Sequence, residues 1–165
     1  MSWRQPLACL TCTTVLLAGC AAPPDHAASR TPTTRFASLS PAEALTPQAL
    51  GARVRWSGGI RSVERRSVDL QCLTLLHATF EPDGFLRWPA GGQTFVACGR
   101  GDYDSMLIEP FTVLSIEGRV VGREMIHRTP VPLIMIDALY RHSDCVQGSE
   151  DSPVCFSGLL RPRAP

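Results

Sequence analysis

The chain has 165 residues, of which 44% are hydrophobic and 19% are charged, and its formal net charge is +1. This composition is typical of a globular protein and excludes a disordered chain, and the length fits a single domain with short extensions. The near-balance of charge argues against nucleic acid as a partner, because surfaces that bind nucleic acid carry a clear excess of basic side chains.

An apolar leader opens the chain and ends in Leu17-Ala18-Gly19-Cys20. One positive charge precedes an apolar stretch over residues 7–17, which is too short to span a bilayer, and small residues precede the cysteine. This pattern is typical of bacterial lipoprotein signal peptides, whereas an ordinary secretory leader or a buried first helix are the alternatives. We therefore expect a signal peptide over residues 1–19 and lipid on Cys20, which would anchor the protein to the periplasmic side of the outer membrane.

Residues 20–48 are rich in Ala, Pro, Ser and Thr, and this composition predicts a flexible tether behind the lipid. Ser40, Pro41 and Glu43 form a capping pattern near its end, and Thr46 and Pro47 repeat the start signal. We expect one or two short helical turns there, and a folded N-terminal arm only near Phe36.

Beyond Gly51 the pattern changes to alternation, with Val54, Trp56 and Ile60 separated by polar or small residues. This predicts a half-buried strand bent at Gly58 and Gly59. The remaining expected elements are a polar turn over 64–67, strands over 68–80, 85–88 and 94–98, a loop over 99–105, strands over 111–121, 123–127 and 133–140, and a tail over 144–165. Many short strands predict an all-β barrel or sandwich over residues 49–143.

Four cysteines remain once Cys9 and Cys12 leave with the leader and Cys20 takes lipid; they are Cys72, Cys98, Cys145 and Cys155. An even number in an exported chain predicts two disulfides. Three pairings are open, and we favour Cys72 with Cys98 and Cys145 with Cys155, because each pair encloses a short loop bounded by turn residues. A four-thiolate zinc site is the alternative, but neither pair has the close C-x-x-C spacing, so no metal is expected.

Three segments, VRWSGG over 54–59, FTVLSIEGRVVG over 111–122 and TPVPLIMIDALY over 129–140, together resemble the Slp family of starvation-inducible outer membrane lipoproteins. Ser57 interrupts the family's W-G-G, and Tyr140 stands where a tryptophan is common, so the chain resembles a distant member. The resemblance covers residues 51–142. It implies a small OB-like antiparallel β-barrel, an outer-membrane location and no established catalytic activity.

Catalytic patterns are weak. There is no G-x-S-x-G motif, and the histidines lie in unrelated contexts, so a metal site joining His127, His142 and Asp144 has no recognised spacing. The tripeptide at Arg100 to Asp102 matches an integrin-recognition motif, which a loop rich in glycine and arginine produces by chance.

Trp56, Phe85, Trp88 and Phe95 form either a core or a stacking face of the kind with which OB-folds bind oligonucleotides or sugars. Trp56 and Trp88 are the candidate binding residues on the second interpretation. We expect a non-enzymatic module without cofactor that serves envelope maintenance or a stress response by contacting envelope proteins or glycans. A ligand-binding module for an oligosaccharide or small molecule is the alternative, and a hydrolase would need a pocket with a histidine or paired carboxylates.

Overall fold

The computed structural model describes residues 35–142 and 155–163, and strands dominate it. Its elements in chain order are η1 (Glu43–Leu45), η2 (Pro47–Ala49), β1 (Arg53–Ser67), β2 (Leu70–Phe80), β3 (Leu86–Arg87), β4 (Thr94–Arg100), β5 (Val113–Ile126), β6 (Thr129–Arg141) and β7 (Gly158–Leu160). In these two described ranges, no helix has the length and apolar character needed to cross a membrane.

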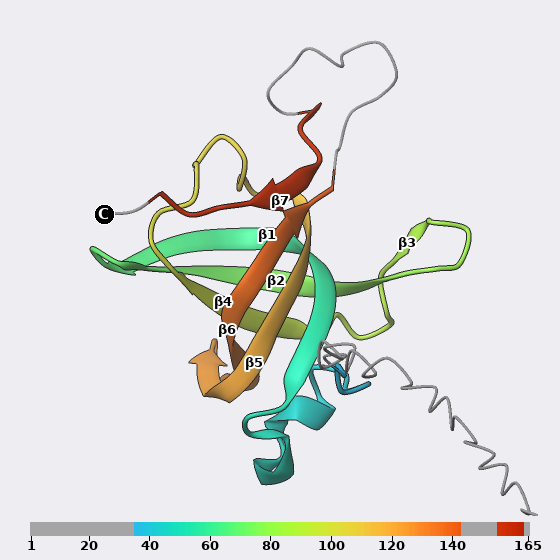
Figure 1. Ribbon diagram of the computed structural model, residues 1–165. Helices are drawn as coiled ribbons and strands as arrows, with labels where there is room; N and C mark the ends of the chain where they lie inside the picture. Colours follow the sequence, from blue (N-terminus) through green and yellow to red (C-terminus); the bar gives the residue numbers. More distant parts are fainter. Residues whose placement is uncertain (1–34, 143–154, 164–165) are drawn as a thin grey trace, which may run out of the picture. The chain divides into compact units, whose positions relative to one another are not determined.

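Five strands close into a barrel (Figure 1). Strand β1 pairs with both β2 and β5, and the ring is completed by the pairs β5–β6, β6–β4 and β4–β2. All of these pairs are antiparallel except β4–β6, which is parallel. The two short strands lie outside the ring, with β3 on β2 and β7 on β6. The fold is therefore an all-β, OB-like barrel, which confirms the predicted class.

Two long hairpins differ from the predicted elements. Residues 64–67 were expected to form a turn, but β1 continues through them and Ser67 pairs with Leu70. Side chains on both faces of β1 are exposed over residues 61–67, so no hydrophobic alternation marks this part of the strand in the sequence. Likewise β5 passes through Gly122, where the pairing register shifts, and β6 includes Pro130 and Pro132. The turn between β5 and β6 is His127–Arg128, and both residues have positive φ.

The barrel interior follows from the period of two along each strand. Inward-facing apolar side chains of all five barrel strands pack into one buried cluster; they include Val54, Trp56, Ile60, Leu73, Leu75, Phe95, Ala97, Leu114, Ile116, Ile134 and Leu139. Gly58 also faces inward, since a Cβ there would lie 2.4 Å from the Leu76 carbonyl oxygen. The close approach of β1 and β2 at this point therefore needs a glycine.

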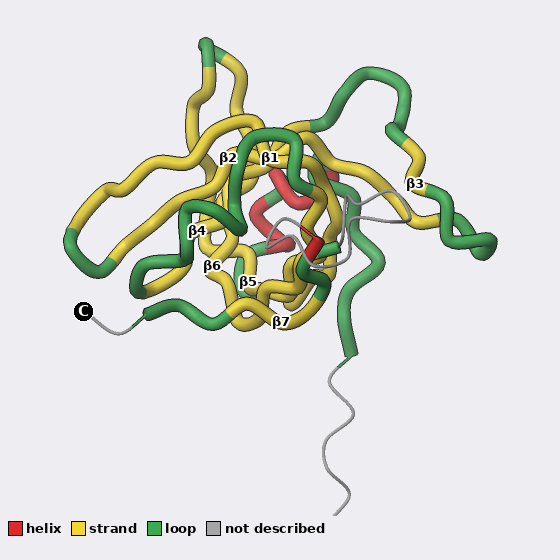
Figure 2. The backbone as a smooth tube through the Cα atoms, turned by 90° about the horizontal axis from the view of Figure 1, so that it is seen from above, coloured by secondary structure: helices red, strands yellow, loops and turns green. Residues whose placement is uncertain are grey.

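The helical turns η1 and η2 lie across one end of the barrel (Figures 1 and 2). Ser40 and Glu43 form the predicted capping box: the Glu43 amide donates to Ser40 Oγ at 3.3 Å, and the Ser40 amide donates to Glu43 Oε2 at 2.7 Å. The Ser40 amide and the Ser40 hydroxyl both donate to the Glu43 carboxylate, which holds the pKa of Glu43 below its ordinary value. Leu39, Ala44 and Ala49 pack in or against the core, so this end of the segment expected as a tether over 20–48 belongs to the barrel, while residues 20–34 lie outside the described residues.

Residues 155–163, the second described range, pack against the side of the barrel. Leu160 of β7 pairs with Leu139 and enters the core, and Arg163 forms a bridge with Asp102. Arg141 is 2% exposed and donates to the carbonyl oxygens of Leu107 and Phe156. A single buried guanidinium thus ties the C-terminal segment to the loop between β4 and β5.

Candidate functional site

Two exposed aromatic side chains line one pocket on the outside of the barrel. Trp88, just after β3, is 49% exposed and its ring covers Gly59, where a Cβ would lie 2.8 Å from the ring. Phe111, just before β5, is 80% exposed. Both line a pocket of about 180 Å³ together with Ile60, Leu76 and other residues. We call this surface, defined by Trp88, Phe111 and Gly59, the Trp88–Phe111 patch.

The backbone of Phe111 is strained. Its φ is +73°, a conformation that bulky L-residues rarely adopt, and its amide donates to the Ile60 carbonyl at 2.8 Å. Folding therefore places a large apolar ring in water and holds its backbone in an unfavourable region. Such strain is concentrated at functional sites, and exposed apolar patches mark contact surfaces.

The other tryptophan of the predicted binding face lies elsewhere. Trp56 is 3% exposed, and its indole Nε1 donates to the Leu39 carbonyl at 2.6 Å. Its ring meets Phe95 edge-on in the core. The prediction that Trp56 forms a binding face with Trp88 is therefore wrong, because the side chain of Trp56 points to the interior face of β1.

The cysteines behave as predicted where the structure describes them. Cys72 and Cys98 form a disulfide. Cys155 is disulfide-bonded as well, while Cys20 and Cys145 lie outside the described residues. Lipidation of Cys20 and the pairing of Cys145 with Cys155 stay predictions.

The disulfide belongs to a second apolar cluster, on the outer face of β2 and β4. Cys72, Val96, Cys98 and Val131 are buried there, and Ile126 of the β5–β6 hairpin packs against them. An ion pair between Arg66 and Glu124 joins the two long hairpins. OB-folds use the corresponding face and hairpins for ligands. In this chain the disulfide and the apolar cluster occupy that face.

The remaining predicted motifs do not assemble a metal site. His127 and His142 flank the whole of β6, and Asp144 lies outside the described residues. Across residues 35–142 and 155–163, no three His, Cys, Asp or Glu side chains form a metal-binding group. Asp102 of the Arg-Gly-Asp tripeptide is held by an ion pair with Arg65 and by the bridge to Arg163, so the tripeptide braces the fold.

A serine–histidine cluster was not foreseen. Ser57 Oγ and Ser115 Oγ share a hydrogen bond of 2.7 Å, and Ser115 Oγ shares another of 2.7 Å with His142 Nε2. Alternation along β1 and β5 could have placed both serines on the outer face. Their contact with His142 depends on the β5–β6 pairing and has no local signal.

This cluster is not arranged for acyl transfer. Ser115 lies within β5 and pairs with Ser57 of β1 on one side and with Tyr140 of β6 on the other. Its backbone groups are therefore committed to the sheet. Nucleophilic serines instead sit on sharp turns, where neighbouring amides are left to bind an oxyanion.

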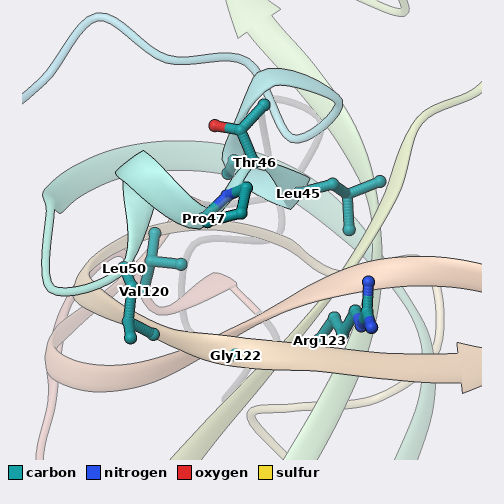
Figure 3. A pocket seen from close by; sticks show the side chains of 8 residues that line it. Leu45, Thr46, Pro47, Leu50, Val120, Gly122 and Arg123 are labelled. Carbon is teal, nitrogen blue, oxygen red and sulfur yellow. The ribbon is translucent and has the colours of Figure 1, made fainter.

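A further pocket, of about 260 Å³, lies between the helical turns and β5 (Figure 3). Leu45, Pro47 and Leu50 approach it from the turns, and Val120 and Arg123 from the strand. Its lining is mostly aliphatic, so it offers little chemistry beyond apolar contact.

Comparison with known proteins adds no relative: no family model matches the chain, and no curated protein matches it either.

Proposed function

We propose that this chain is a lipid-anchored, non-enzymatic binding module of the bacterial outer membrane, facing the periplasm, which contacts another envelope component through the Trp88–Phe111 patch. The observation that carries the proposal is the exposed ring of Phe111 on a strained backbone. Exposure of the ring leaves an apolar surface in water, and backbone strain is concentrated at functional sites, so both features support a contact surface at this position.

Two observations support the expected location in the outer membrane, facing the periplasm. The Leu-Ala-Gly-Cys ending of the leader is the pattern of lipoprotein processing, and a structural disulfide fits an oxidising compartment such as the periplasm. Two or more acyl chains on Cys20 would give stable anchoring, since each buried methylene contributes about 0.8 kcal/mol.

The position of Ser115 inside β5, paired with strands on both sides, also favours a binding role over hydrolysis. Its place inside a paired strand leaves no neighbouring amide to stabilise an oxyanion.

The anchor is tested by growing cells with an alkyne-modified fatty acid and floating their membranes in a density gradient. The full chain should carry the label and float with the outer membrane, whereas Cys20→Ala should lose both properties. A Cys20→Ala protein that still floats would contradict anchoring at this residue.

The contact is tested by chemical crosslinking of envelopes followed by purification of the full chain and of Phe111→Ser. A specific partner should be recovered with the parent chain and be strongly depleted with the variant. Equal recovery of the partner with both proteins would contradict a contact through the Trp88–Phe111 patch.

A further inference from the structure

We propose that a second surface, on the outer face of β1, β5 and β6, is a binding site for a neutral saccharide. It is a pocket of about 470 Å³ whose lining includes Arg55, Ser115, Glu117, Tyr140 and His142. Its volume lies in the range of small-molecule sites. We call it the Tyr140 pocket; it shares no lining residue with the Trp88–Phe111 patch and does not depend on the lipid anchor.

The polar groups of the pocket are held in place before any ligand arrives. Arg55 Nε donates to Glu117 Oε1 at 2.9 Å, and the Arg55 guanidinium lies 4.4 Å from the centre of the Phe36 ring. Ser115 Oγ is fixed between Ser57 and His142. A preorganised set of polar side chains reduces the entropy lost on binding.

The charges favour a neutral ligand. Arg55 and Glu117 form an ion pair within the pocket and so compensate each other. The lining still offers both kinds of hydrogen-bonding group, because the Arg55 guanidinium donates and the Glu117 carboxylate accepts. Sugar hydroxyls also donate and accept, so a saccharide matches this mixture better than an ion of either sign.

The aromatic side of the pocket supplies an apolar surface. The Tyr140 ring is partly exposed and meets the His142 ring edge-on, with 5.0 Å between centroids, and the Phe80 ring lies 4.5 Å from the His142 ring. The Tyr140 hydroxyl shares a hydrogen bond of 3.2 Å with Ser157 Oγ of the C-terminal segment. An aromatic ring held in this way can pack against the C–H face of a sugar ring, while polar neighbours take its hydroxyls.

Saturation-transfer NMR on the full chain in detergent micelles tests this site, with maltotriose and chitotriose as neutral probes and a trimer of galacturonic acid as the anionic probe. We expect transfer to at least one neutral trisaccharide at millimolar concentration. Tyr140→Ala should weaken that binding by about tenfold, and Tyr140→Phe, which keeps the ring, should retain it.

Phe85→Ala is the matched control, because it removes an exposed aromatic ring that lies outside both the Tyr140 pocket and the Trp88–Phe111 patch, and it should leave saccharide binding unchanged. Circular dichroism of each variant shows whether it is folded, and the Tyr140→Phe comparison is informative even if Tyr140→Ala unfolds. The proposal is overturned if neither neutral probe binds, if the anionic probe binds more tightly, or if folded Tyr140→Ala binds as the parent does.

Discussion

Cys72 and Cys98 lie directly opposite each other on β2 and β4, with their Cα atoms 4.0 Å apart, and their disulfide is buried against Val96 and Val131. The bond therefore joins two neighbouring strands of the barrel and at the same time fills the outer face that OB-folds leave open for ligands.

Removing this disulfide should destabilise the barrel. The bond closes a loop with a sequence separation of 26, for which loop entropy predicts a contribution of about 3.5 kcal/mol. Urea unfolding of the double variant Cys72→Ala/Cys98→Ala should show a loss of that order. Cys145→Ala/Cys155→Ala is the comparison variant, and its loss should be smaller because the predicted pair closes a shorter loop. Unchanged unfolding of the first variant would show that the disulfide adds nothing to the packed cluster.

Arg141 should be essential for holding the C-terminal segment. Replacing it with methionine leaves the part-buried carbonyls of Leu107 and Phe156 without this donor, at a cost of about 1–3 kcal/mol. We expect lower stability in urea and faster proteolysis within residues 155–163. Exposed Arg161 is the control, and Arg161→Met should change neither measurement. Parent-like proteolysis of Arg141→Met would show that β7 pairing alone holds the segment.

Acidification should destabilise the fold through His77. Burial lowers the pKa of His77 below its ordinary 6.5, and its Nδ1 is buried without a hydrogen-bond partner beside the rings of Trp56 and Phe95. The unfolded chain binds this proton more readily than the folded chain. Stability is thus fully present above about pH 6.5 and is lost as the pH falls toward the lowered pKa.

Urea midpoints at several pH values between 5 and 8 measure this effect. Between pH 5 and 6.5, the dependence of the urea midpoint on pH should be weaker in His77→Phe than in the parent. It should be unchanged in His127→Asn, which alters an exposed histidine in a turn. An identical slope in the parent and in His77→Phe would assign the acid sensitivity to other groups.

Gly58 and Gly59 should respond differently to the same substitution. A Cβ at Gly58 would meet the Leu76 carbonyl oxygen at 2.4 Å, whereas one at Gly59 would meet the exposed Trp88 ring at 2.8 Å. Backbone cannot move aside as a side chain can. Gly58→Ala should therefore cost about 1–3 kcal/mol in urea unfolding, and Gly59→Ala clearly less.

Gly59→Ala should instead displace Trp88, which tryptophan fluorescence reports against the constant signal of buried Trp56. Equal losses of stability, with unchanged emission from Gly59→Ala, would contradict the packing of Trp88 on Gly59.

The sequence predicted those features that depend on neighbouring residues or on strong composition. The Ser40–Glu43 capping box, the hairpin of Phe80 with Leu86 and the Cys72–Cys98 pair all follow from short spacings or from cysteine parity.

Features that depend on tertiary context were missed. The polar residues 64–67 indicated a turn because side chains on both faces of the strand that they form are exposed to solvent. Strand β7 is too short to show a pattern in the sequence. Trp56 and Trp88 each follow an arginine in the sequence, and only the fold shows that the ring of Trp56 is in the core and the ring of Trp88 is exposed. The Ser115–His142 contact likewise arises from strand pairing.

The central claim is that Phe111 contacts an envelope component. Site-specific photo-crosslinking in intact cells tests it most directly, with a benzoylphenylalanine placed at position 111 of the full chain and, as control, at exposed Val68 on the β1–β2 hairpin. We predict a discrete adduct from position 111 that is absent from position 68 and is lost when Trp88→Ala is added. No adduct from position 111, or the same adducts from both positions, would contradict the account.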